Sequence, residues 1–296
     1  MPKTAITVLL LSTWAAWSQD THYPAIADVH LHYNYDQVAE ISPKEAVAIL
    51  KQQNVQLAVV SSTPPELALT LQKAGGPWII PLFRPYFNNR QRYSWFKDRQ
   101  VLPRAREALE SGAYQGVGEI HMVAGIGPAH HNLVLNGLIR LAIEFNVPLL
   151  IHIETSSHLY FEPLCQRYSK ARFLLAHGGG LLDHEQIGSL MMACPNVWIE
   201  FSARDHWRYV QSPIVDNNGR LLQGWAKLVL RFPDRFMIGS DPYWPVEKEL
   251  ALEESDTGWL KIDEYLNFHR KWLGFIPDNV RRKLQIENAR DFFTQH

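Results

Sequence analysis

The stretch Ala25-Ile26-Ala27-Asp28-Val29-His30-Leu31-His32 decides how the rest of the chain is interpreted. A short apolar run leads into two histidines that are one residue apart. In an extended strand, alternate side chains point to the same face, so we expect His30 and His32 to project together from the strand's end. Two imidazoles that converge in this way form half of a site for a divalent transition metal. The pair alone is equally consistent with one core and one surface histidine.

An apolar run followed by a helical segment recurs along the whole chain. Helix boundaries are marked by features such as the Ser42 cap and the Gly75-Gly76 stop. Continuous apolar runs are typical of strands that are buried on both faces. We therefore predict an α/β fold, a single-domain (β/α)8 TIM barrel. A doubly wound open sheet is the alternative, although no Gly-x-Gly-x-x-Gly turn follows the first strand. The further strand candidates are residues 55–60, 78–83, 116–120, 147–152, 172–177, 196–201 and 235–241.

Polar side chains recur at the predicted ends of these strands. Because the carboxyl ends of barrel strands meet at one face, we expect these side chains to converge. Nitrogen and oxygen ligands without sulfur suit Zn²⁺, and also Mn²⁺, Fe²⁺ or Ni²⁺. The sequence therefore predicts a site for one or two divalent ions, with zinc as the preferred metal. Its candidate ligands are His30, His32, Glu119, His152, His177 and Asp241.

In their sequence context, these residues resemble the amidohydrolase superfamily, and specifically its amidohydrolase-related branch (amidohydrolase 2). That branch also includes non-oxidative decarboxylases. The similarity extends over essentially all of residues 19–296, including a closing helix at residues 288–293. The motifs that carry it are His30-Leu31-His32, Leu150-Ile151-His152, Ala176-His177-Gly178-Gly179 and Gly239-Ser240-Asp241.

The resemblance implies a metal-dependent TIM-barrel hydrolase and a role for each ligand. His30, His32 and Asp241 would hold the first metal. His152 would complete a mononuclear site, or hold a second metal together with His177. Many binuclear members bridge their metals with a carboxylated lysine after the fourth strand, where this chain has no lysine. Glu119 resembles the bridging glutamate of the metal-dependent deoxyribonuclease branch; the alternative is a strand-end acid paired with a basic neighbour.

The expected reaction is hydrolysis of an amide, lactone or other ester bond by a metal-activated water. Asp241 would take the proton of this water and pass it to the leaving group, and His177, if not a ligand, would stabilise the oxyanion or act as acid/base. Arg84 and Arg204 are candidates to bind a substrate carboxylate, with a rim salt bridge such as Arg204–Asp205 as the alternative. The competing functions are a carboxy-lyase and a metal- or ligand-binding barrel without catalysis.

Residues 1–18 have the features of a signal peptide, with Lys3 before an apolar core and small residues at Ala16 and Ser18. We therefore expect an exported protein, periplasmic or secreted, whose mature barrel is residues 19–296. An N-terminal helix packed on the domain is the alternative. A formal net charge of −1 argues against a nucleic-acid-binding surface. No other stretch is long and apolar enough to span a membrane. The expected partner is a small-molecule substrate, and a homo-oligomer stays open.

The cysteines and the other histidines carry weaker signals. Cys165 and Cys194 fall in predicted helices, where separate buried residues are the more common case and a disulfide is the alternative after export. Ten tryptophans and thirteen histidines favour an aromatic-lined pocket. The remaining histidines are interpreted as surface or loop residues, with His121 and His158 nearest the barrel mouth. They are His22, His121, His130, His131, His158, His184, His206 and His269.

Overall fold

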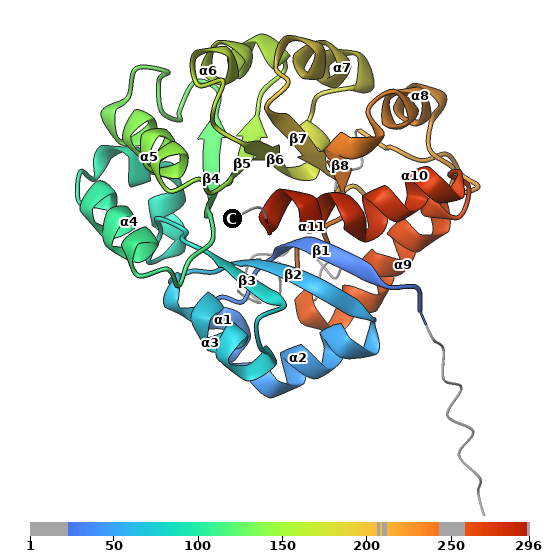
Figure 1. Ribbon diagram of the computed structural model, residues 1–296, viewed down its shortest axis with the longest axis horizontal. Helices are drawn as coiled ribbons and strands as arrows, with labels where there is room; N and C mark the ends of the chain where they lie inside the picture. The colour runs from blue at the N-terminus through green and yellow to red at the C-terminus, as the bar shows by residue number, and fades with distance from the viewer. Residues whose placement is uncertain (1–22, 206–207, 209–211, 243–257, 295–296) are drawn as a thin grey trace, which may run out of the picture.

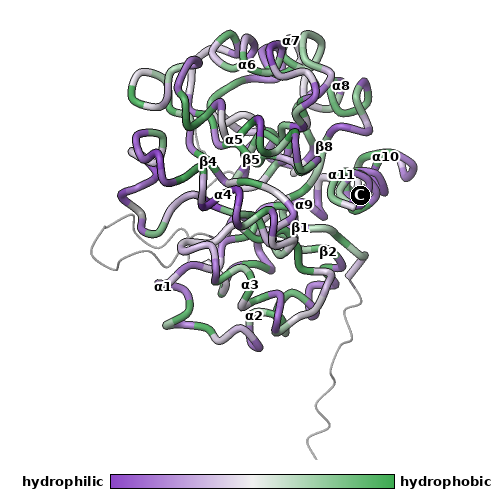
Figure 2. Tube along the Cα trace, turned by 60° about the vertical axis from the view of Figure 1, so that its left-hand side comes forward, coloured by the Kyte–Doolittle hydropathy of each residue, from purple (hydrophilic) through white to green (hydrophobic). Residues whose placement is uncertain are grey.

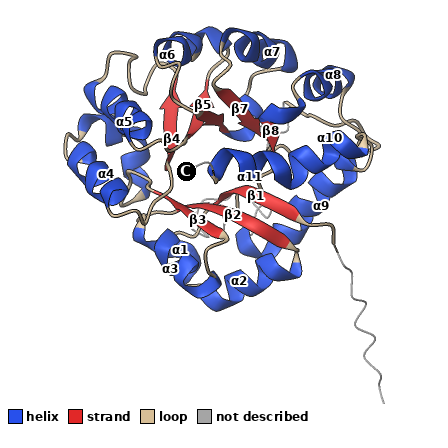
Figure 3. Ribbon diagram, in the orientation of Figure 1, coloured by secondary structure: helices blue, strands red, loops and turns tan. Residues whose placement is uncertain are grey.

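The computed structural model describes residues 23–205, 208, 212–242 and 258–294. Within these ranges, eight strands form the inside of the molecule, and helices surround them (Figure 1; Figure 3). Each strand coincides with a run that the sequence predicts. The strands are β1 (Ile26–Leu31), β2 (Val55–Ser61), β3 (Ile79–Leu82), β4 (Val117–Val123), β5 (Leu149–Glu154), β6 (Phe173–Leu175), β7 (Val197–Glu200) and β8 (Phe236–Met237).

Backbone hydrogen bonds join two parallel sheets, β1-β2-β3 and β4-β5-β6-β7-β8, into one barrel. Between β3 and β4, the Phe83 nitrogen donates to the Gly116 oxygen, and the Gly118 nitrogen donates to the Phe83 oxygen, both at 2.9 Å. Between β8 and β1, the Val29 nitrogen donates to the Ile238 oxygen at 2.9 Å. The (β/α)8 barrel that the sequence predicts is therefore confirmed.

The helices start and stop at signals that the sequence contains. At α2, the Ser42 side chain accepts from the Glu45 nitrogen while the Glu45 carboxylate accepts from the Ser42 nitrogen, which satisfies two otherwise unpaired donors. Two short 3-10 helices, η1 (Asn89–Tyr93) and η2 (Trp95–Lys97), lie between β3 and α4. The helices are α1 (Tyr35–Val38), α2 (Pro43–Gln52), α3 (Glu66–Gly75), α4 (Val101–Glu110), α5 (Leu133–Glu144), α6 (Glu162–Arg167), α7 (His184–Ala193), α8 (Gln223–Arg231), α9 (Ile262–Leu273), α10 (Asp278–Arg282) and α11 (Asn288–Phe293).

The barrel interior is apolar at the amino ends of the strands. Phe292 and Phe293 of α11 pack against this inner layer, and α11 lies beside β1 and β8 in Figure 1. Figure 2 shows the hydrophobic stretches that run along β1 and β2. Because this end is filled, polar side chains gather at the opposite end. The inner layer consists of Ala27, Val29, Leu57, Val59, Ile80, Leu82, Leu150, Leu174, Ala176 and Met237.

An irregularity in β1 turns its histidines toward the barrel axis. The register of β1 against β2 shifts between Asp28 and Leu31. Ala27 and Val29 contribute to the apolar inner layer, whereas His30, the next residue, lies among the polar groups above it. A local change of register re-aims the side chains that follow. The sequence predicts that His30 and His32 share a face, but it does not reveal this change of phase.

Two further expectations concern the cysteines and the N-terminal segment. Cys165, in α6, and Cys194, after α7, form a disulfide, so the interpretation as separate buried residues is wrong. Residues 1–18, predicted as a signal peptide, lie outside the described residues, as do His22 and His206. Among the helices that the structure describes, none has the length and apolar character needed to cross a bilayer.

Candidate metal centre

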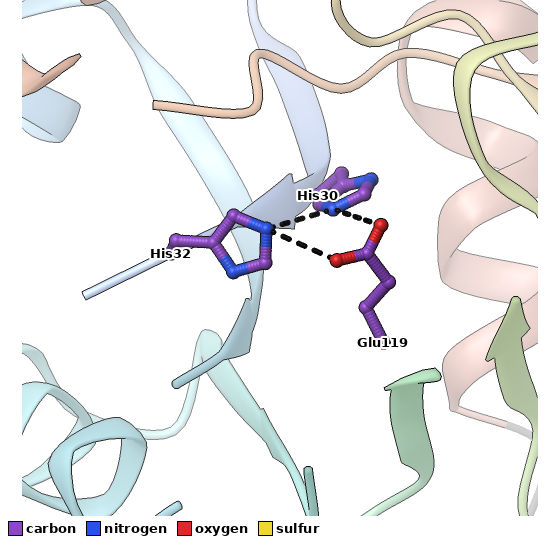
Figure 4. A group of neighbouring side chains, drawn as sticks. All are labelled: His30, His32 and Glu119. Atoms are coloured by element: carbon purple, nitrogen blue, oxygen red, sulfur yellow. Dashed lines mark hydrogen bonds and ion pairs between the residues drawn. The ribbon is translucent and has the colours of Figure 1, made fainter. Parts of the chain in front are cut away.

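The six predicted ligands lie together at the carboxyl ends of the strands, with Glu119 at their centre. Glu119 Oε1 lies 3.1 Å from His152 Nδ1 and 3.4 Å from His177 Nε2. Its other oxygen, Oε2, lies 3.4 Å from His32 Nε2, and the Nε2 atoms of His30 and His32 are 3.1 Å apart (Figure 4). One carboxylate therefore faces two pairs of histidines that come from three different strands and the turns after them.

Asp241, which follows β8, faces the same group. Its Oδ1 lies 3.2 Å from His32 Nε2 and 3.8 Å from His30 Nε2, and its Oδ2 lies 3.9 Å from His177 Nδ1. Burial by itself raises the pKa of this carboxyl, but the neighbouring histidines outweigh burial and hold the pKa well below its usual value. Asp241 is therefore an ionised acceptor beside these histidines.

His30 and His32 use their outer ring nitrogens for hydrogen bonds to the protein. His30 Nδ1 lies 2.8 Å from Glu200 Oε1. His32 Nδ1 lies 2.5 Å from the backbone oxygen of Ser61, at the end of β2. Both acceptors require the proton on Nδ1, which leaves a lone pair on each Nε2.

His152 and His177 follow the same rule from the other side of Glu119. His152 Nε2 lies 3.0 Å from Glu154 Oε1, and His177 Nδ1 lies 2.9 Å from the hydroxyl oxygen of Ser202. With the protons on these outer nitrogens, the lone pairs of His152 Nδ1 and His177 Nε2 face each other at 3.0 Å. Facing lone pairs repel unless a proton or a cation lies between them, and outer hydrogen bonds of this kind are what metal-ligating histidines make.

The charges of the site also suit a cation. The carboxylates of Glu119 and Glu200 are buried, the side chain of Asp241 is only 15% exposed, and burying unpaired negative charge is costly. Burial lowers the pKa of His30, but these three carboxylates outweigh burial and raise it well above its ordinary value. Burial also lowers the pKa of His152, whereas its carboxylate partners raise the pKa to about 9. A divalent cation would supply the positive charge that the site otherwise draws from protons.

Two residues of the site were not predicted from the sequence. Glu200, the last residue of β7, is fully buried against His30. His121 on β4 is 6% exposed, and its ring stacks on that of His152 with centroids 4.4 Å apart. The surface-or-loop interpretation is therefore wrong for His121, and also for His269, which is fully buried in α9.

The signal for both missed residues was present in the sequence. The two-residue alternation that pairs His30 with His32 also pairs Glu119 with His121. Glu200 ends an apolar run just as His152 and His177 do.

The two arginines predicted to bind substrate lie within the protein. Arg84 is 2% exposed, and its Nη2 lies 2.8 Å from Glu119 Oε2, so the pairing of Glu119 with a basic neighbour is present alongside its contacts to the histidines. Arg204 is 1% exposed and donates to the backbone oxygen of His177 at 3.2 Å. Asp205, which the alternative interpretation paired with Arg204, forms its ion pair with Arg208. These contacts favour structural roles for both arginines over binding of a substrate carboxylate.

Comparison with known proteins gives a consistent result. A family model described as Amidohydrolase matches residues 87–294. Among curated proteins, none matches the chain.

Several solved structures resemble most of the chain in fold. A TatD homologue from Escherichia coli K12 aligns with a TM-score of 0.62 at 14% identity, over 92% of this chain and 98% of that one. An amidohydrolase from Burkholderia multivorans with bound zinc aligns with a TM-score of 0.55 at 15% identity, over 92% and 99%. A phosphotriesterase homology protein from Escherichia coli, complexed with phosphate, aligns with a TM-score of 0.58 at 13% identity, over 91% and 98%.

Proposed function

This chain belongs to the amidohydrolase family of metal-dependent hydrolases, and from that premise we propose that it hydrolyses an amide, lactone or ester bond of a small molecule. The observation that carries the proposal is the arrangement of the four histidines. Each one uses its outer nitrogen for a protein acceptor and turns its inner nitrogen toward Glu119 or a neighbouring histidine. Such an arrangement supports metal ligation, because the facing nitrogens need either protons or a cation between them.

We propose that the site holds two divalent ions. Among the described residues, three groups of side chains could hold a metal ion, and one of them consists of His30, His177 and Glu200. The other two groups share one residue: His30 and His32 with Glu119, and His152 and His177 with Glu119. This sharing supports Glu119 as the bridge between the ions. Imidazole and carboxylate ligands support zinc, and they also suit Mn²⁺, Fe²⁺ and Ni²⁺, which metal analysis of the purified protein would distinguish.

The protein residues then have separable tasks in hydrolysis. A bound divalent ion supplies Lewis acidity and lowers the pKa of a water toward neutrality. Asp241, kept ionised by the surrounding histidines, accepts the proton of the attacking water and delivers it to the leaving group. His177 turns Nε2 toward Glu119 and His152, which supports ligation over the alternative of oxyanion stabilisation. Arg84 holds Glu119 in place through a short ion pair.

The test is a screen of the zinc- or manganese-loaded protein against lactones, esters, N-acyl amino acids and phosphodiesters. We expect the protein to hydrolyse a carbon–oxygen or carbon–nitrogen bond in at least one of these compounds. Release of carbon dioxide without water consumption would instead identify a carboxy-lyase. If the protein binds metal but neither hydrolyses any of these compounds nor releases carbon dioxide from one, the result would support a metal-binding barrel without catalysis.

We also propose that residues 1–18 direct export and are then removed. The Cys165–Cys194 disulfide supports this proposal, because disulfides persist in oxidising compartments outside the cytosol. Mass spectrometry of the protein recovered from the periplasm or the medium would test it. We expect a chain that begins at Gln19, whereas an intact N-terminus would contradict export by cleavage.

A further inference from the structure

Two ligands of the centre adopt a backbone conformation that is unusual for their residue type. His177 has φ +56° and Asp241 has φ +53°, both in the left-handed region. Residues other than glycine rarely adopt this region. Where they do, the surrounding structure must hold the backbone in place. His177 follows β6 and Asp241 follows β8, so they flank the end of β7 on either side.

The first of these residues is held by an arginine that follows β7. Arg204 donates through Nη1 to the backbone oxygen of His177 at 3.2 Å and to the backbone oxygen of Gly180. Its guanidinium lies over the ring of Trp225, with 5.5 Å between Cζ and the ring centroid. One buried side chain therefore ties together both ends of the turn that carries His177.

The second residue is held in the same way by Arg208. Its Nη1 donates to the backbone oxygen of Asp241 and its Nη2 to that of Ser240, both at 2.8 Å. The buried Asp205 accepts from Nε of Arg208 at 2.8 Å, and the guanidinium lies 3.8 Å from the ring centroid of Tyr265. Arg208 is thus fixed from two sides while it bonds the two carbonyls.

We propose that Arg204 and Arg208 are positioning residues, which hold His177 and Asp241 in the conformations that aim their side chains at the metal centre. This inference rests on the metal site proposed above. Each guanidinium bridges two backbone carbonyls at once, and the direction of a side chain follows from the backbone it is attached to. Lysine carries the same charge but presents a single ammonium group, which does not reproduce the two-pronged geometry.

Arg204→Lys and Arg208→Lys test the proposal when zinc binding is measured by competition with a chromophoric chelator. We expect each variant to lose about tenfold in zinc affinity, the scale seen when groups that orient metal ligands are removed. The visible spectrum of the cobalt-loaded protein should change as well, since it reports ligand geometry. Asp205→Asn, which weakens the anchor of Arg208, should produce a smaller loss in the same direction.

Arg235→Lys is the matched control. Arg235 also bridges two backbone carbonyls, those of Cys194 at 3.0 Å and Met191, but it lies before the amino end of β8. We expect a comparable change in melting temperature with zinc affinity within about twofold of wild type, because this bridge does not touch the ligands.

The outcomes separate this inference from the proposed function. If the wild-type protein binds no zinc, the metal site itself fails. If the wild type binds zinc and the two lysine variants bind it equally well, with an unchanged cobalt spectrum, the positioning role is wrong. Equal losses in Arg235→Lys would also overturn it, because the effect would then be one of general stability.

Discussion

The site contains two carboxylate–histidine pairs of the same chemistry in opposite surroundings. In the inner pair, His30 Nδ1 lies 2.8 Å from Glu200, whose side chain is fully buried. In the rim pair, His152 Nε2 lies 3.0 Å from Glu154, whose side chain is 48% exposed. Solvent screens an exposed charge and leaves a buried one almost unscreened. The two hydrogen bonds therefore have similar lengths but unequal energies. If the site binds two ions as proposed, we expect the half that contains His30 and His32 (the inner half) to bind an ion more tightly than the half that contains His152 and His177 (the rim half).

The inner carboxylate is also more widely connected. Glu200 accepts hydrogen bonds from the backbone nitrogen of His177 at 2.9 Å and from the backbone nitrogen of Ser202 at 2.6 Å. It thereby links the ends of β6 and β7 to His30 on β1. A buried network of this kind fixes several groups at once, so damage to one member is transmitted to the others.

The largest effect is expected at Glu119, which belongs to both halves. Glu119→Gln should abolish binding of at least one ion and reduce turnover by about a thousandfold or more, since the amide is a poor bridge. It also leaves Arg84 buried without its anionic partner, and such losses cost about 3–5 kcal/mol of stability. Metal analysis and urea denaturation measure the two effects separately.

Glu144→Gln is the control for the loss of an ion pair. Glu144 pairs with Arg106 at 2.8 Å, with both side chains exposed, so its removal should cost less than about 1 kcal/mol. A Glu119→Gln protein that keeps two ions and wild-type turnover would show that Glu119 does not bridge the halves.

The second-largest effect is expected at Asp241, where a substitution should reduce turnover while part of the bound metal remains. Asp241→Asn removes the proton acceptor, so turnover should fall about 10²–10⁴-fold. Zinc held by His152 and His177 should remain, because Asp241 lies on the inner side. Turnover and metal content measured on the same preparation check this, and circular dichroism confirms that the fold is intact. Full activity of the variant would contradict the assignment of Asp241 as the base.

The features predictable from the sequence are those that repeat along it. Eight apolar runs fixed the number of strands, and the polar residue at each strand end identified His30, His152, His177 and Asp241 because the barrel brings equivalent positions together. The residues that hydrogen-bond the outer nitrogens of these histidines were harder to predict from the sequence. The pairing of Glu200 with His30 joins residues far apart in the chain, and only the closed barrel brings them within hydrogen-bond distance.

Loop residues were harder still, because their partners are backbone atoms. Arg204 donates hydrogen bonds to the backbone oxygens of His177 and Gly180. Because every residue type has a backbone carbonyl, no sequence pattern predicts this contact. The tryptophans illustrate the same limit. Their abundance suggested a pocket wall, yet Trp259 Nε1 donates to the backbone oxygen of His32 at 2.9 Å and Trp95 Nε1 to that of His121 at 3.2 Å.

Identical substitutions in the two pairs compare the halves directly, and Glu200→Gln should have the larger effect. It keeps the shape of the side chain and removes the charge that orients and polarises His30. We expect zinc affinity to fall about 10–100-fold. A chelator competition that resolves two binding steps would place this loss on the tighter step. An unchanged tighter step would contradict the unequal strengths of the two halves.

Glu154→Gln should have the smallest effect, a loss of about two- to threefold in zinc affinity, because solvent already screens the rim carboxylate. Its clearer signature is in the metal-free protein. Burial lowers the pKa of His152, but hydrogen bonds to Glu119 and Glu154 raise it to about 9, above its ordinary value of 6.5. The stability that protonated His152 contributes is therefore complete below about pH 6.5 and disappears as the pH rises through about 9. Without the Glu154 carboxylate, this pKa falls and the stability disappears at lower pH. Urea denaturation of both metal-free proteins between pH 6 and 10 measures the difference, and superimposable pH profiles would show that the rim carboxylate does not act on His152.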